Sequence, residues 1–314
     1  MKRLLVTGAD GFVGRWLVRA ALAEGLEVVA AIGPGGKPPS GWLDKPDADR
    51  VEWFELDITS ADVLQRVADC RADAVVHLAA VASGAAARRD PALASRVNTD
   101  AAVSLTRALV QGGNPVRLLF VSTGEVYGAG HGEPIAEDAA VAPVSPYAGS
   151  KADAERGIAE VVSGSQVELV IARPFPHTGP GQSTDFVVPA FAARIRQAAR
   201  DGSSGIAVGN LDVTRDFLDV RDVVRAYLLL LRHGASGEVY NVASGVGQRL
   251  DQVLALLTRL VGTRVQPVVD PELVRPADIP VLVGDATKLR RVTGWSPSIN
   301  LEQTFRDLLD AQAD

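Results

Sequence analysis

The chain has 314 residues, of which 47% are hydrophobic and 22% charged, and its formal net charge is −6. This composition is that of a soluble globular protein, long enough for one large domain or two smaller ones. An acidic chain without a lysine- or arginine-rich tract gives no sign of nucleic acid as a partner, although local loops can still bind nucleotides. The single cysteine, Cys70, excludes an internal disulfide and indicates a reducing compartment.

The N-terminal segment MKRLLVTGADGFVG is not typical of a signal peptide, because its apolar run is short and ends at a glycine turn. No apolar stretch of the sequence approaches the roughly 20 residues that a membrane-spanning helix needs. We therefore expect a cytoplasmic protein that has no membrane partner.

The first half of the chain alternates strand-like runs with helical patterns. Apolar residues recur at helical spacing from Phe12 to Ala21, and a further helix is expected over Pro91–Gln111. The runs with the composition of strands are Arg3–Thr7, Glu27–Ile32, three runs starting at Val51, Ala74 and Arg117, and Glu168–Pro174. This alternation predicts an α/β fold, a Rossmann-like doubly wound parallel sheet covered by helices on both faces.

After Pro174 the pattern changes to a turn-rich loop followed by separate helical stretches. Helices are expected near residues 187–200, 222–231 and 250–261, and an amphipathic helix closes the chain. Because this half has too few regular strands for a sheet of its own, we predict a dinucleotide-binding domain over residues 1–173. Residues 174–314 would form a smaller substrate-binding lobe, with some chain crossing back to the sheet.

Gly8, Gly11 and Gly14 are spaced three residues apart between the first strand and the first helix. Glycines at these positions allow a tight turn, a close backbone approach to a pyrophosphate, and close packing of the helix on the strand. The N-terminus of the helix then directs free N–H groups at the phosphates. In the first strand–helix unit of an alternating chain, this motif predicts a dinucleotide site.

The end of the second strand indicates which dinucleotide binds. NAD-specific sites usually carry an acid there for the ribose hydroxyls, whereas this chain has AAIGPGGK, which contains Lys37 and no acid. We expect Lys37 to meet the 2′-phosphate of NADPH, although it could also be a solvated loop lysine. Asp57, after the third strand, is placed to accept a hydrogen bond from an adenine amino group.

Tyr147 and Lys151 are four residues apart, which places them on one face of a helix. An ammonium beside a phenol stabilises the phenolate and lowers a pKa that is normally about 10. Such a phenol can donate or accept a proton near neutral pH. Thr123, at the end of the fifth strand, is placed to hydrogen-bond the same substrate oxygen.

The motifs TGADGFVG, LDI, HLAA, VNTD, STGEVYG, SPYAGSK and RPFPHTGPGQ follow one another over essentially the whole chain. In type and order they resemble those of the extended short-chain dehydrogenases/reductases, the group of nucleotide-sugar epimerases, dehydratases and reductases. The resemblance implies that Tyr147 is the acid/base, that Lys151 also holds the nicotinamide ribose, and that Thr123 polarises the substrate. It also implies that Asn98 positions the lysine through water. The cofactor-binding residues implied are Gly8, Asp10, Gly11, Phe12, Val13, Gly14, Asp57, Ile58, Leu78, Ala79, Ala80, Asn98, Tyr147, Lys151, Pro174 and His177.

Within this group, the C-terminal segments are most similar to those of GDP-4-keto-6-deoxy-mannose reductases. By that likeness Arg215 and Arg275 hold the phosphates or the sugar of the nucleotide, and Ser83, Thr123 and Glu125 also contact the substrate. A guanidinium group binds phosphate through a bidentate, charge-assisted contact. The implied function is NAD(P)H-dependent reduction of a nucleotide-linked 4-keto-6-deoxyhexose, with NADP preferred and NAD possible.

Two positions depart from the pattern of the group. Dehydratases carry an acid beside the threonine, or a serine in the GDP-mannose branch, where this chain has Gly124. Glu125 alone remains as a second acid/base, and the reductases keep a glutamate there too. Pro176 replaces an asparagine that helps to bind the sugar nucleotide, so the nucleotide base stays open. The first alternative is a 4-epimerase or 4,6-dehydratase with retained NAD(P), and the second is a non-catalytic dinucleotide-binding module.

The histidines are scattered, with no pair at metal-ligand spacing, so we expect no metal site. His77 lies in a strand that should be buried, which favours a role in the core. His177 fits a cofactor contact and a purely structural loop role equally well. The resemblance also implies a homodimer, although no segment of the sequence identifies its interface.

Overall fold

A seven-stranded parallel sheet forms the centre of the computed structural model, which describes residues 1–38, 41–60, 62–131, 134–274 and 279–311. The strands lie in the order β3–β2–β1–β4–β5–β6–β11. Their bounds are β1 Arg3–Thr7, β2 Glu27–Ile32, β3 Val51–Glu55, β4 Ala74–His77, β5 Val116–Val121, β6 Val167–Pro174 and β11 Val239–Val242. The doubly wound parallel sheet predicted from the sequence is therefore confirmed.

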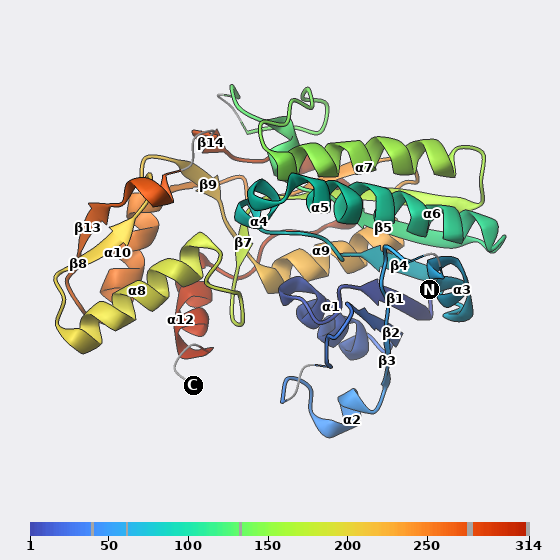
Figure 1. Cartoon of the computed structure of the whole chain (residues 1–314), viewed down its shortest axis with the longest axis horizontal. Helices are drawn as coiled ribbons and strands as arrows, with labels where there is room; N and C mark the ends of the chain where they lie inside the picture. Colours follow the sequence, from blue (N-terminus) through green and yellow to red (C-terminus); the bar gives the residue numbers. More distant parts are fainter. Residues whose placement is uncertain (39–40, 61, 132–133, 275–278, 312–314) are drawn as a thin grey trace.

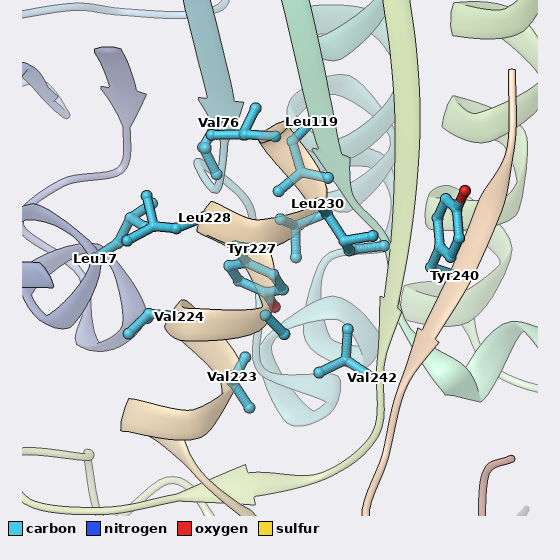
Figure 2. Packing of buried hydrophobic residues seen from close by; sticks show 14 of the residues in the cluster. Leu17, Val76, Leu119, Val223, Val224, Tyr227, Leu228, Leu230, Tyr240 and Val242 are labelled. Carbon is cyan, nitrogen blue, oxygen red and sulfur yellow. The ribbon is translucent and has the colours of Figure 1, made fainter. Parts of the chain in front are cut away.

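Alternate residues of each strand point to opposite faces of the sheet, and different helices cover the two faces. On one face Leu4 and Val6 pack in an apolar cluster with α1 (Phe12–Ala23) and α9 (Val220–His233), part of which is seen in Figure 2. On the other face Leu5 packs with α3 (Val63–Asp69), α6 (Ala101–Gln111) and α7 (Pro146–Val162). Figure 1 shows the two helical layers on either side of the sheet.

The sequence predicted six strands, and the seventh strand, β11, was missed. It pairs with β6, so that Tyr240 lies opposite Ala172. Its four residues, VYNV, are too few for periodicity to distinguish a strand from a loop, and only the pairing with β6 defines them as a strand. Because α9 and β11 both come from the second half of the chain, that half covers and extends the central sheet.

The single helix expected over Pro91–Gln111 is wrong in one respect, because a turn of π-helix interrupts it. The three parts are α5 (Pro91–Ser95), the π-turn η1 (Arg96–Asp100) and α6. Asn98 lies in η1 and is buried. Turns of π-helix are rare in proteins, and those that occur are often found at functional sites. The apolar stripe continues on both sides of the turn, so spacing alone does not reveal it.

Helices of the second half form a separate apolar cluster at one end of the sheet (Figure 1). They are α8 (Val187–Asp201), α10 (Leu250–Val261) and α12 (Leu301–Ala311). Short strands form small sheets of their own in the second half. They are β7 (His177–Thr178) with β10 (Leu218–Asp219), β8 (Gly205–Val208) with β13 (Gln266–Val269), and β9 (Thr214–Asp216) with β12 (Gly247–Arg249) and β14 (Val281–Leu282). The remaining short helices are α2 (Lys45–Ala48), α4 (Gly84–Arg89), η2 (Gly124–Tyr127), η3 (Pro271–Leu273) and α11 (Thr287–Thr293). None of the helices described has the length and apolar character of a membrane span.

Candidate active site

A cavity of about 690 Å³ lies at the carboxyl edge of the central sheet. Loops that follow β1, β2, β3, β4 and β5 form one side of its wall, and segments of the second half form the other. β1 lies between β2 and β4, and the order of the strands reverses here: β2 and β3 follow on one side of β1, and β4, β5 and β6 on the other. Folds of this type bind ligands at such a switch point, and a volume in the range of about 300–1,000 Å³ is usual for a ligand site.

The glycine turn after β1 is built for close backbone approach. Gly8 has a φ of +69°, and a Cβ atom there would lie 2.8 Å from the backbone nitrogen of Ala79. A Cβ atom on Gly14 would collide with the carbonyl oxygen of Gly8, and one on Gly11 would lie 3.1 Å from the same oxygen. The first turn of α1 carries no acidic residue. The turn and the helix N-terminus therefore fit a dinucleotide pyrophosphate.

Beside the glycine turn, one end of the cavity is lined by Gly33, Pro34, Asp57 and Ile58. The Asp57 carboxylate accepts hydrogen bonds from the hydroxyl and the backbone N–H of Thr59, at 2.6 and 2.8 Å, and these lower the pKa of Asp57. A fixed carboxylate at this point fits an adenine amino group.

Lys37 is exposed and does not line the cavity, so its expected contact with a 2′-phosphate stays a prediction. A cation that the sequence analysis missed lies nearer to the glycine turn. Arg15, in the first turn of α1, donates from Nε to the carbonyl oxygen of Asp10 at 2.8 Å. Asp10 lines the cavity, whereas Arg15 itself does not. Its only sequence signal is its place directly after Gly14.

The other end of the cavity holds Thr123, Tyr147 and Lys151. Tyr147 and Lys151 lie in the first two turns of α7, which starts where the Ser145 hydroxyl accepts a hydrogen bond from the backbone N–H of Ala148 at 3.1 Å. Thr123 directly precedes η2, and its side chain hydrogen-bonds the Tyr147 phenol. The structure thus brings the three predicted catalytic side chains into one cavity wall.

The acid–base state of this group differs from the expectation. Burial raises the pKa of Tyr147, Glu125 raises it further, and the hydrogen bond from Thr123 lowers it only in part. The Lys151 ammonium donates to the carbonyl oxygen of Val121 at 2.8 Å and is itself buried. Burial lowers the pKa of Lys151 to about 8, against an opposing effect of Glu155. Tyr147 is therefore a protonated phenol at neutral pH.

Asn98 does not line the cavity. Its side-chain oxygen accepts from the backbone N–H of Val81 at 2.7 Å, and its amide nitrogen donates to the Ser150 hydroxyl at 3.0 Å. Ser150 precedes Lys151 in α7 and donates to the carbonyl oxygen of Tyr147 at 2.8 Å. The π-turn thus ties the loop after β4 to the helix that carries the tyrosine and the lysine.

Three residues predicted to bind substrate lie on the wall near Thr123, namely Ser83, Glu125 and Arg215. The Arg215 guanidinium, on β9, donates to the carbonyl oxygens of Thr214 and Ile279, at 2.9 and 2.6 Å. These contacts fix the head group at the boundary between sheet and lobe. Arg275 lies outside the described residues.

The segment after β6 covers the end of the cavity beside Tyr147. The His177 ring stacks on Phe12, with ring centroids 6.3 Å apart, and its Nδ1 lies 3.0 Å from the carbonyl oxygen of Phe175. Burial lowers the pKa of His177, which keeps the ring neutral. Pro176 also lines the cavity. His177 therefore contributes to the wall and to the loop structure at once.

Most other predicted cofactor residues are also part of the wall, and it contains residues that sequence reasoning missed. The remaining predicted residues in the wall are Phe12, Val13, Leu78, Ala79, Ala80 and Pro174. Those that were missed include Arg88, Thr178, Gln182, Ser183, Asp185, Phe217 and Tyr227. They come from helices and loops whose own patterns indicate packing or turns, and only the tertiary structure brings them to the cavity.

A parallel sheet with a glycine turn at its switch point and a Thr–Tyr–Lys group at its edge defines the short-chain dehydrogenase/reductase class of proteins. The family model for GDP-mannose 4,6 dehydratase matches residues 5–308. The chain therefore belongs to that family, within the extended short-chain dehydrogenases/reductases.

Individual relatives cover almost the whole chain. It is 37% identical to a GDP-6-deoxy-D-mannose reductase of Pseudomonas aeruginosa, over 98% of this chain and 96% of the relative. It is 29% identical to a UDP-glucose 4-epimerase of Mycolicibacterium smegmatis, over 96% of this chain and 95% of the relative. Among solved structures, RMD from Pseudomonas aeruginosa in complex with NADPH is similar, with a TM-score of 0.80, 34% identity and 99% of each chain covered. The relatives are thus enzymes of nucleotide-sugar chemistry.

Proposed function

We propose that this protein reduces the keto group of a nucleotide-linked 4-keto-6-deoxyhexose, with NADPH as the preferred reductant and NADH as a possible one. The observation that carries the proposal is the group of Thr123, Tyr147 and Lys151 in the wall of the cavity. The 37% identity to a GDP-6-deoxy-D-mannose reductase, and the similarity to a structure that contains NADPH, support it.

Bound NADPH would supply the hydride that adds to the carbonyl carbon. As that carbon is reduced, its oxygen becomes an alkoxide, and Tyr147 is placed to give this oxygen its proton. The Thr123 hydroxyl would donate a hydrogen bond to the same oxygen, stabilising the charge that develops there. The Lys151 ammonium would bind the hydroxyls of the nicotinamide ribose and stabilise the phenolate that Tyr147 becomes when it gives up its proton.

The protonation state of Tyr147 is compatible with reduction. A reductase needs a phenol that starts with its proton, whereas oxidation of a sugar hydroxyl needs a phenolate that starts without it. Burial and the Glu125 carboxylate both raise the pKa of Tyr147, which favours the protonated form. A protonated Tyr147 thus suits the reduction step, which a 4-epimerase also carries out in its second half-reaction.

The substrate would enter from the side of Ser83, Glu125 and Arg215. Arg215 lines the cavity, and its guanidinium is held in place by the carbonyl groups of Thr214 and Ile279. A guanidinium at this point would suit a phosphate of the sugar nucleotide. We extend the same role to Arg275, following the family resemblance. Since Pro176 offers neither an amide side chain nor an N–H group, recognition of the sugar nucleotide would rely on the other wall residues.

The direct test is turnover. Purified protein is incubated with NADPH and GDP-4-keto-6-deoxy-mannose, and the loss of nicotinamide absorbance is followed. Parallel reactions contain the dTDP-, UDP- and CDP-linked ketosugars, and a reaction without sugar is the control. Oxidation of NADPH by none of the four substrates would overturn the proposal.

A second candidate is a nucleotide-sugar 4-epimerase, which the 29% identity to a UDP-glucose 4-epimerase supports. An epimerase returns the hydride to the sugar and keeps its NAD, so it is purified with bound cofactor and needs no added reductant. Mass spectrometry of the ligand released on denaturation separates this candidate from the reductase.

We further propose that the protein works as a homodimer in the cytoplasm, with residues 1–173 mainly binding the cofactor and residues 174–314 mainly the substrate. The free, buried Cys70 is compatible with a reducing compartment. Light scattering on the purified protein checks the dimer.

A further inference from the structure

Tyr227 has a hydroxyl group that is buried in the cavity wall and has no hydrogen-bond partner in the described part of the chain. The residue is 0% exposed and lies on α9. Figure 2 shows its ring between α9 and the sheet, with the hydroxyl pointing away from Val76 and Leu119. Buried tyrosine hydroxyls nearly always have a partner. An apolar core position would be filled equally well by phenylalanine, so this oxygen indicates a ligand.

Two features place this hydroxyl at the Tyr147 end of the cavity. α9 starts directly after β10, which pairs with β7 so that Asp219 lies opposite Thr178. A Cβ atom on Gly179 would lie 2.9 Å from a methyl group of Val220, so the start of α9 is packed tightly against the loop after β6. Helical side chains lean toward the N-terminus of their helix, which brings the Tyr227 phenol toward that loop. The electrostatic effect of Tyr147 on Tyr227 agrees with this placement.

Each region of the cavity wall fits a different part of a bound dinucleotide. Asp57 lies at the adenine end and the glycine turn holds the pyrophosphate, so the region around Tyr147 and Lys151 receives the nicotinamide riboside. The nicotinamide ring has one polar substituent, its carboxamide, which both donates and accepts hydrogen bonds. A phenol also does both. Thr178, 1% exposed and likewise without a partner for its hydroxyl in the described structure, lines the same region.

We propose that the Tyr227 hydroxyl binds the carboxamide group of the nicotinamide and, together with Thr178, fixes the face of the ring that is turned toward Tyr147. This rests on the proposed function in that it requires a nicotinamide cofactor. Tyr227 is then a cofactor-positioning residue on a helix that otherwise serves as core.

The test uses the Tyr227→Phe variant and two ligands, NADP⁺ and 2′-phospho-ADP-ribose, which lacks the nicotinamide. Calorimetry gives both dissociation constants. Loss of one hydrogen bond should weaken NADP⁺ by about five-fold and leave the fragment unchanged. Thr178→Val should act in the same direction. If the protein prefers NAD, the pair NAD⁺ and ADP-ribose serves instead.

Stability of the ligand-free protein provides the second readout. Because none of the residues that the structure describes hydrogen-bonds the Tyr227 hydroxyl, Tyr227→Phe should leave the melting temperature equal or slightly higher. The matched control is Tyr240→Phe, whose hydroxyl accepts from the backbone N–H of Ala235 at 2.9 Å outside the cavity wall. This control should lower the melting temperature and leave both affinities unchanged.

Equal effects on both ligands, no effect on either, or a clear loss of ligand-free stability in Tyr227→Phe would each overturn this role. If the wild-type protein binds neither dinucleotide, the proposed function itself fails, and the two failures are thus distinguished.

Discussion

The Arg173 guanidinium and the Glu155 carboxylate form a bidentate ion pair in which both side chains are buried. The two N–O distances are 3.0 and 2.6 Å. Arg173 lies on β6 and Glu155 on α7, one turn after Lys151, and the guanidinium also lies over the Tyr127 ring, 4.8 Å from its centroid. The pair therefore fixes the helix that carries Tyr147 and Lys151 against the sheet.

Removing one partner of this pair should be costly. Glu155→Gln leaves a buried guanidinium without its counter-charge, so we expect the free energy of unfolding to fall by about 3–5 kcal/mol. The double variant Glu155→Leu/Arg173→Met removes both charges and should lose less than the single variant. Urea denaturation measures both. A loss below about 1 kcal/mol in Glu155→Gln would show that the pair contributes little.

The pH dependence of turnover should follow the Lys151 ammonium. Burial lowers the pKa of Lys151 to about 8, so the charged form that binds the ribose is present below this pH and is lost above it. We expect kcat/KM to fall as the pH rises through about 8. Because Glu155 raises this pKa, Glu155→Gln should move the fall to lower pH. The phenol of Tyr147, with its raised pKa, stays protonated over this range. A profile that stays flat into strongly alkaline solution would contradict this assignment.

Tyr147→Phe removes the proposed proton donor and little else. We expect kcat to fall by about 10²- to 10⁴-fold, the usual contribution of a positioned acid, with NADPH affinity nearly unchanged. Single-turnover kinetics and cofactor titration measure the two effects. Tyr240→Phe, which lies outside the cavity wall, is the control for loss of a tyrosine hydroxyl. A variant that still turns over at the wild-type rate would show that Tyr147 is not the proton donor. A wild-type protein that binds NADPH but turns over no ketosugar would point to a non-catalytic dinucleotide-binding module.

Gly124 leaves no room for the acid that dehydratases carry beside the threonine. A Cβ atom there would lie 2.9 Å from the ring of Phe175, which is fully buried. We therefore expect Gly124→Asp to lower the free energy of unfolding by about 1–3 kcal/mol through overpacking. It should gain no elimination of water from GDP-mannose. Thermal denaturation and product analysis test both statements, and a stable variant with dehydratase activity would contradict them.

Cofactor preference can be tested at Lys37. If this exposed lysine meets the 2′-phosphate, Lys37→Glu should weaken NADPH by a few-fold, since a partly exposed pair is worth up to about 1 kcal/mol. NADH affinity should not change. Lys45→Glu is the matched control, because Lys45 has a side chain that is 86% exposed and pairs with Asp49. If Lys37→Glu changes the affinities for NADPH and NADH equally, Lys37 is only a surface lysine. Arg15 would then be the next candidate for the contact with the 2′-phosphate.

The sequence alone determined the elements whose signals are local. The glycine spacing after β1, the near-continuous apolar strands and the four-residue spacing of Tyr147 and Lys151 each lie within a short window. Turn chemistry and side-chain periodicity therefore predicted the sheet, the phosphate turn and the residue types at its edge. The order of the family motifs along the chain supplied the remaining site residues.

Only the tertiary structure decided what depends on partners far apart in the chain. β11 is a strand because it pairs with β6, and Tyr227 belongs to the site because α9 packs at the loop after β6, although its pattern is that of an ordinary core residue. The pKa of Tyr147 rises because the fold desolvates it and places it near Glu125. Burial and nearby charge are properties of the packed chain. The four-residue spacing of Tyr147 and Lys151 predicted a lowered pKa for the tyrosine, whereas the cost of removing the phenolate charge from water raises it.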